Sequence, residues 1–179
     1  ERAKGRLYRV RYKETPYAKP FDLSQKTDDE LFLLLEGPNE YLRSTARRLL
    51  GERVSVDSAV VRKLRQRVSD VTVSLQPRLH SLWTLAAIDG GVGDELPSKL
   101  LTDPQPLLRA WGFRLTGDRS DSHERLGGVN HLLLEQTDPK VALQALAAIG
   151  KSSFDPLNKA SLLLFAGANH SDDSVATQL

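Results

Sequence analysis

From residue 27 onward, apolar residues recur at helical spacing. Leu42, Ala46, Leu49 and Leu50, for example, form one stripe along a helix that begins near Pro38. Several similar segments begin at proline and end at glycine, as helices commonly do. The pattern predicts helices over residues 27–37, 38–53, 58–68, 76–91, 94–103, 104–117, 123–137, 138–150 and 155–169, with a shortened one at 171–179.

The first 26 residues follow a different pattern. Residues 5–12 alternate apolar and mostly basic side chains with period two, which predicts a β-strand. A single strand cannot satisfy its backbone hydrogen bonds, so its partners are expected outside this chain. Residues 14–26 contain Pro16 and Pro20 and are predicted to be an extended linker. We therefore divide the chain into 1–26, a terminal strand of a preceding domain plus linker, and 27–179, a helical repeat domain.

Two stretches of the helical part match without a gap at an offset of 66 residues, 37–53 and 103–119. Pro38 corresponds to Pro104 and Arg43 to Arg109, and the matches continue to the end of both stretches. Self-similarity at a fixed offset is typical of repeat proteins, whose helix pairs bury their apolar faces only by stacking. The predicted fold is therefore all-α: an α-α superhelix of about four to five helix pairs, each stretch being the second helix of a pair.

The turn before a predicted second helix and the Leu-Arg pair inside that helix resemble a known family. Asp103-Pro104 followed by Leu108-Arg109 is similar to the second helix of HEAT repeats, and Gly37-Pro38 with Leu42-Arg43 matches except for the aspartate. Residues 138–150 keep the Asp-Pro turn but have Gln144 where arginine is expected. The resemblance implies a HEAT-like, armadillo-like α-solenoid over residues 27–179, used for protein binding or as a scaffold.

The order of the parts also resembles a bacterial architecture. In planctomycete-type membrane-bound dehydrogenase-like proteins, a sugar-dehydrogenase-like β-propeller precedes HEAT repeats and often a c-type haem domain. That resemblance implies that residues 5–12 are the last propeller strand and that the chain is a fragment of a larger secreted multidomain protein. It further implies a periplasmic or extracellular location, with a cytoplasmic one left open. The chain has no cysteine and so no CxxCH motif, and no haem or catalytic residue is carried over.

The composition excludes several kinds of catalytic and metal-binding site. Without cysteine, the chain of 179 residues has no disulfides, thiolate metal sites or cysteine nucleophiles. Its four histidines lack metal-ligand spacing, and the glycine-rich residues 89–95 lack the strand and Gly-Lys-Ser ending of a phosphate loop. Trp83 and Trp111 lie in apolar stripes and are predicted to be core residues. We predict no catalytic, cofactor-binding or metal-binding residues, and no membrane insertion because no apolar run approaches ~20 residues.

Two further hypotheses concern the roles of the basic residues. Arg43 and Arg109 recur at one repeat position beside the apolar stripe, which favours a structural ladder, a series of contacts in which each arginine binds an adjoining turn. Other cations between residues 47 and 67 form either a solvated helix face or a patch for an anionic partner: Arg47, Arg48, Arg53, Arg62, Lys63, Arg65 and Arg67.

The leading hypothesis for function is a non-catalytic scaffold or protein-interaction module whose partner is a protein. Two alternatives stay open: a nucleic-acid-binding basic solenoid, or an accessory segment of a sugar-dehydrogenase-like or electron-transfer enzyme.

Overall fold

The computed structural model describes residues 12–14, 21–119, 121–127, 132, 136, 138–152 and 160. Within them every regular element is a helix, which confirms the all-helical prediction for this part of the chain. The 3₁₀ helix η1 (Leu23–Gln25) precedes α1 (Asp28–Leu34), α2 (Glu40–Glu52), α3 (Ser58–Ser69), α4 (Leu75–Ala87), α5 (Glu95–Leu100), α6 (Pro106–Gly117), α7 (Ser122–Gly127) and α9 (Pro139–Lys151). Residues 5–11 of the predicted strand, and the helices predicted beyond residue 155 apart from residue 160, lie outside the described residues.

Local sequence explains where these helices start. Thr27 and Glu30 form the predicted capping box at the start of α1, and Asn39 and Asp138 cap α2 and α9 with their side chains. The expected starts at residues 38 and 104 lie two residues before the observed ones, Glu40 of α2 and Pro106 of α6. The expected start at residue 76 lies one residue after Leu75, the first residue of α4, so Pro77 lies inside the first turn of this helix. Proline is tolerated there because the first N–H groups of a helix have no intrahelical acceptor.

The predicted linker also needs a correction near its end. Leu23–Gln25 form a 3₁₀ turn instead of an extended segment, with the Asp22 carboxylate accepting from the Ser24 N–H at 2.9 Å. Leu23 is buried, and the turn packs against α2. Burial of one large apolar side chain accounts for the departure from extended structure.

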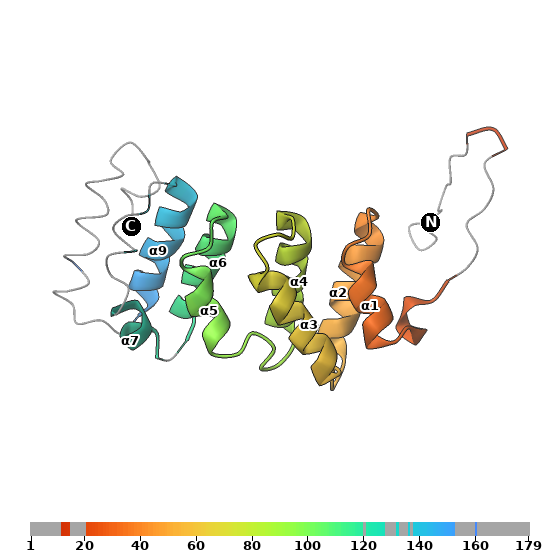
Figure 1. The fold of residues 1–179 in the computed structure, drawn as a ribbon, viewed down its shortest axis with the longest axis horizontal. Helices are drawn as coiled ribbons and strands as arrows, with labels where there is room; N and C mark the ends of the chain where they lie inside the picture. Colours follow the sequence, from red (N-terminus) through yellow and green to blue (C-terminus); the bar gives the residue numbers. More distant parts are fainter. Residues whose placement is uncertain are drawn as a thin grey trace, which may run out of the picture.

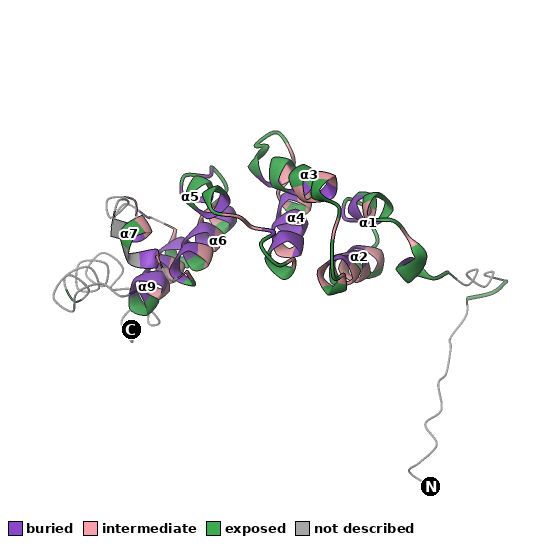
Figure 2. Ribbon diagram, turned by 90° about the horizontal axis from the view of Figure 1, so that it is seen from below, coloured by how far each residue is buried: buried purple, intermediate pink, exposed green. Residues whose placement is uncertain are grey.

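The helices stand side by side in a row along the long axis of the molecule (Figure 1). Seen from below, they form two layers along a shallow arc, with α1, α3, α5 and α7 on the outer side and α2, α4, α6 and α9 on the inner side (Figure 2). Successive helices pack as the pairs α1–α2, α3–α4 and α5–α6, and α7 packs on α9. Within the inner layer, α2 packs on α4 and α6 packs on α9.

Among the described residues, the apolar core between the two layers consists of two clusters, and α6 contributes side chains to both. One cluster of buried side chains extends from Leu31 in α1 through Leu64 and Leu82 to Leu108 in α6. A second cluster around Phe113 joins α6 to α7 and α9. Because side chains from successive pairs share one cluster, no pair buries its apolar face alone.

The 66-residue match corresponds to a repeated helix crossing. A Cβ on Gly51 would lie 2.8 Å from the Cβ of Ala87, and a Cβ on Gly117 would lie 2.6 Å from the Cβ of Ala148. Gly51 and Gly117 are 66 residues apart, and each alanine is the third residue of an identical Leu-Ala-Ala-Ile sequence. Thus α2 crosses α4, and α6 crosses α9, through the same close glycine–alanine contact. We call α1–α4 the first unit and α5–α9 the second unit.

An ion pair repeats in the two units as well. Arg53 donates to the Asp28 carboxylate and to the carbonyl of Lys26. Arg119, 66 residues later, donates to the Asp94 carboxylate, with the carbonyl of Gly93 at 3.4 Å. In both units the contact ties the end of the second helix to the start of the first, so the sequence match extends to tertiary contacts.

Candidate functional site

The recurring arginines fasten the start of each inner-layer helix. Arg43, Arg78 and Arg109 are each the fourth residue of α2, α4 and α6, respectively. Their guanidinium groups donate to backbone carbonyls that precede the helix: Arg43 to Gly37 at 2.5 Å, Arg78 to Val68 at 2.8 Å and Arg109 to Asp103 at 2.9 Å. Each arginine therefore joins an inner helix to the turn or helix before it.

Two of these arginines also reach forward along the array. Arg78 donates to the carboxylate of Asp103, and Arg109 donates from Nε to Oε1 of Gln136 at 3.1 Å. Asp103 and Gln136 both lie two residues before the N-cap residue of the next inner helix. Arg43 instead pairs with Glu40 of its own helix, and its buried Nε has no partner among the described residues.

Arg78 was missed by the sequence analysis. Aligning Pro77 with Pro38 shifts the register, because Pro77 lies within α4 whereas Pro38 precedes α2. Alignment on the helix starts would have placed Arg78 beside Arg43 and Arg109. With 1% of its side chain exposed, Arg78 is the most buried arginine of the three.

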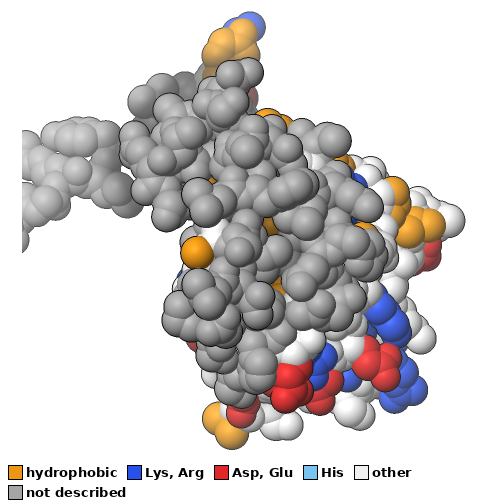
Figure 3. All heavy atoms as spheres, turned by 90° about the vertical axis from the view of Figure 1, so that its left-hand side faces the viewer, with side chains coloured by type: hydrophobic (Ala, Val, Ile, Leu, Met, Phe, Trp, Pro, Cys, Tyr) orange, Lys and Arg blue, Asp and Glu red, His pale blue; other side chains and the backbone are white. Residues whose placement is uncertain are grey.

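The predicted cationic patch is divided between the two layers. Arg47 and Arg48 lie on α2 and Arg53 follows it, whereas the remaining four cations lie on α3. Most are bound within the chain, through the pairs Arg48–Glu52, Arg53–Asp28, Lys63–Asp29 and Arg67–Glu36 and through hydrogen bonds from Arg65 to the carbonyls of Gly90 and Gly91. Figure 3 views the opposite end of the array, where α7 and α9 lie, and there too acidic and basic side chains lie next to one another, at the lower right.

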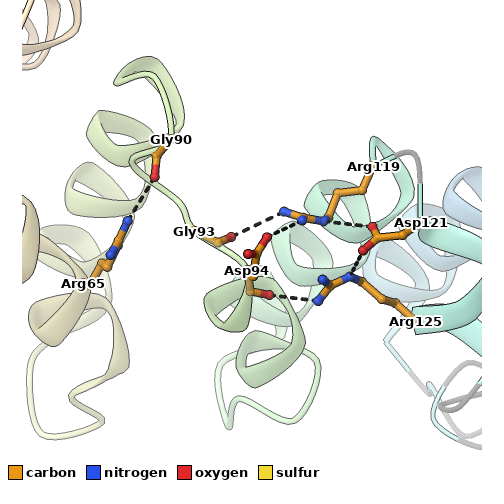
Figure 4. A network of polar contacts seen from close by, with 7 residues as sticks. All are labelled: Arg65, Gly90, Gly93, Asp94, Arg119, Asp121 and Arg125. Atoms are coloured by element: carbon orange, nitrogen blue, oxygen red, sulfur yellow. Dashed lines mark hydrogen bonds and ion pairs between the residues drawn. The ribbon is translucent and has the colours of Figure 1, made fainter.

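Polar contacts also fix the glycine-rich loop between the two units (Figure 4). Arg65 binds the loop from α3, while Arg119 and Arg125 bind Asp94 from the second unit. Asp121 accepts from both of these arginines, and the hydrogen bond from Arg125, more than that from Arg119, holds the pKa of its carboxyl below the ordinary value. Gly90, with φ of +63°, adopts a backbone conformation that favours glycine. The loop is therefore a structural junction.

A groove opens on the inner layer where the two units meet. Trp83 of α4 and Trp111 of α6 approach edge to face, with ring centroids 6.2 Å apart. With Arg47, Arg48, Ala86 and Ala87 they line a groove of about 490 Å³. We call it the junction groove.

A second groove of about 280 Å³ lies between α6 and α9, and we call it the α6–α9 groove. Trp111 lines this groove too, together with Leu107, Ala110, Arg114, Lys140, Leu143 and Gln144. Trp111 therefore separates two apolar grooves on the same layer.

The tryptophans were expected in the core, but both are only partly buried. Each ring packs on the core and also forms a groove wall, because α4 and α6 pack less closely than the glycine-mediated pairs. The Arg47 guanidinium lies 5.4 Å from the Trp83 centroid, and that of Arg114 lies 5.0 Å from the Trp111 centroid. Among the described residues lining the two grooves, none is acidic.

His80 of α4 is buried next to Trp83. Its ring meets Trp83 edge to face at 5.2 Å, and its Nδ1 has no hydrogen-bond partner among the described residues. Burial lowers the pKa of His80, and the positive charges of Arg43 and Arg47 lower it further, against the opposing charge of Glu40. The His80 ring is therefore neutral at neutral pH.

The described residues contain no group of three or more His, Asp or Glu side chains arranged to hold a metal ion. None of their helices combines the length and apolarity needed to cross a membrane.

The described chain is thus an all-helical protein built of packed helix pairs, with an aromatic, cation-flanked groove on one layer. Comparison with protein families, with curated proteins and with solved structures gave no match.

Proposed function

We propose that this chain is a HEAT-like α-solenoid that works as a non-catalytic protein-interaction module, with the junction groove and the α6–α9 groove as its docking surface. The observation that carries the proposal is the pair of partly buried tryptophans at the meeting point of two equivalent units. Tryptophan and arginine are the residues most enriched at energetically dominant positions of protein interfaces, and this surface presents both.

The HEAT assignment is supported by the two-layer arrangement of helix pairs and by the arginines at equivalent positions of α2, α4 and α6. Stacked pairs offer a long surface on one layer, which suits contact with another protein chain. The resemblance to propeller-containing bacterial proteins supports a place within a larger exported multidomain protein. Under this proposal, any electron-transfer activity of such a larger protein belongs to its other domains.

The nucleic-acid alternative has less support. Neutralising several phosphates requires several cations on one surface. Here Arg47 and Arg62 lie in different layers, and Arg53 and Arg67 are already paired with carboxylates of this chain. A protein partner is therefore the better proposal.

An unbiased peptide selection tests the proposed function. Random peptides displayed on phage are selected against the protein and then tested for binding to Leu107→Glu, which places a charge in the α6–α9 groove. Val71→Glu is the matched control, since Val71 is exposed in the loop between α3 and α4. The proposal predicts enriched peptides that lose binding to Leu107→Glu and keep it to Val71→Glu. Failure to enrich any groove-dependent peptide would reject the proposed function.

A further inference from the structure

We propose that the two grooves beside Trp111 hold a single extended acidic segment of a partner protein, with its apolar side chains in the grooves and its carboxylates on Arg47 and Arg114. This inference rests on the proposed function, because it names the partner class for the same surface. It specifies that the bound segment is negatively charged and that its backbone is extended.

Charge complementarity identifies the sign. The grooves carry Arg47, Arg48, Arg114 and Lys140, and none of their described lining residues is acidic. Of these cations, Arg48 pairs with Glu52, whereas Arg47 and Arg114 have no carboxylate partner among the described residues. Complementary charge selects partners and raises the rate of association. The surface therefore favours a segment rich in Asp and Glu.

The tryptophans make these two cations better carboxylate ligands. Each guanidinium lies over an indole ring, a position that favours cation–π attraction. A guanidinium fork binds a carboxylate with two parallel hydrogen bonds, and such pairs strengthen where water is excluded. Arg47 and Arg114 are thus placed to fix two carboxylates on either side of an apolar surface.

The spacing of the grooves sets the geometry of the segment. The junction groove and the α6–α9 groove lie on the two sides of α6. A helix with its side chains is about 10–12 Å across, so side chains entering the grooves on the two sides of α6 are separated by roughly that distance. An extended polyproline-type chain rises about 3.1 Å per residue and repeats its face every three residues. Two apolar residues three positions apart therefore reach both grooves.

The ring geometry disfavours bound nucleic-acid bases. Stacking of a base requires an open indole face. Here Trp83 and Trp111 meet edge to face at an interplanar angle of 64°, and a guanidinium covers a face of each ring. A base stacked on that face would displace the guanidinium from the ring. A carboxylate can instead bind the guanidinium while the cation–π contact stays in place.

A labelled-peptide titration tests the inference. The probe is a fluorescein-labelled peptide of about nine residues with two leucines three positions apart among Glu and Pro, measured by fluorescence anisotropy. Two control peptides carry Lys for every Glu, or Ser for both leucines. The protein variants are Arg47→Glu and Arg114→Glu, with Arg47→Gln and Arg114→Gln as milder changes should either charge reversal disturb folding. Arg62→Glu is the matched control, because Arg62 is exposed on α3 in the other layer.

The inference predicts saturable binding of the acidic peptide, weakened about tenfold or more by each groove charge reversal. Arg62→Glu should change affinity by less than about twofold, and both control peptides should bind far more weakly. Equal binding of the Lys peptide, equal loss with Arg62→Glu, or no binding of the acidic peptide would each overturn it. Displacement of the peptide by oligothymidylate would overturn it in favour of nucleic acid.

These results separate the inference from the proposed function. If phage selection yields groove-dependent peptides without acidic residues, the docking surface stands and the acidic occupant is wrong. If selection yields no groove-dependent peptide, the docking surface itself is wrong.

Discussion

Replacing Arg78 by Met removes the most buried polar link between the two units. The Arg78 and Asp103 side chains are 1% and 6% exposed. The Nε of Arg78 also donates a hydrogen bond to the carbonyl oxygen of Val68 at 2.8 Å. Met retains most of the apolar stem, so the loss is mainly that of the charged contacts. It leaves the Asp103 carboxylate buried with one remaining bond, from the Gln105 N–H at 2.9 Å. Removing one partner of a buried ion pair costs about 3–5 kcal/mol of unfolding free energy.

Urea unfolding followed by far-UV circular dichroism measures this cost. Arg48→Met is the matched control: its pair with Glu52 is 60% and 56% exposed, so the loss should stay below about 1 kcal/mol. In the double variant Arg78→Met with Asp103→Asn, the buried charge is gone but the bond to Gln105 can remain. The double variant should therefore be less destabilised than the sum of the two single variants, with a coupling of about 0.5–3 kcal/mol.

A cost of Arg78→Met below about 1 kcal/mol would refute this reasoning, because it would place the pair in a solvated environment. Strict additivity in the double variant would show that the two side chains do not interact.

Three further predictions concern the repeated contacts and the buried histidine. Gly117→Ala should destabilise by about 1–3 kcal/mol, because its Cβ would lie 2.7 Å from the Cα of Ala148. In the same urea assay Gly150→Ala should be neutral or stabilise by up to about 1 kcal/mol, because among the described residues only its own helix and chain neighbours come within 4 Å of the new Cβ. Arg53→Met should cost about 1–3 kcal/mol and Arg119→Met less than about 1 kcal/mol, because the Asp28 side chain is 14% exposed and that of Asp94 is 76% exposed. A larger cost for Arg119→Met than for Arg53→Met in the urea assay would contradict this reasoning. Because burial lowers the pKa of His80, its contribution to stability should be complete above about pH 6.5, the ordinary histidine value, and should fall as the pH is lowered toward the folded-state pKa. The decrease in unfolding free energy between about pH 7.5 and about pH 5.5 should be smaller in His80→Phe; an unchanged decrease would show that His80 does not titrate differently in the folded state.

Sequence periodicity predicted most of the helices but not all of their ends. The capping box at Thr27 could be predicted because cap and helix are local in sequence. The prolines did not fix the register of the helices, since proline is tolerated both before a helix, as at Pro38, and within its first turn, as at Pro77. That ambiguity concealed Arg78 and with it the link to Asp103.

The candidate site was only partly predictable. Offset matching brought out Arg43 and Arg109 because both keep the same distance from their turns. The burial of Trp83 and Trp111 was overestimated, since an apolar stripe shows which side of a helix faces its neighbours but not how closely they pack. That distance depends on contacts such as Gly51 against Ala87, for which the junction between α4 and α6 has no counterpart among the described residues.

Quenching of tryptophan fluorescence tests the docking surface most directly, because the only two tryptophans of the chain both line the grooves. A groove-dependent peptide from the phage selection, chosen to lack tryptophan, is added at saturation, and quenching by iodide is compared with and without it. The account predicts that the bound peptide shields both rings, lowers the quenching constant and shifts the emission to shorter wavelength. Saturated binding with unchanged quenching and emission would place the peptide elsewhere and would contradict the groove as the docking surface.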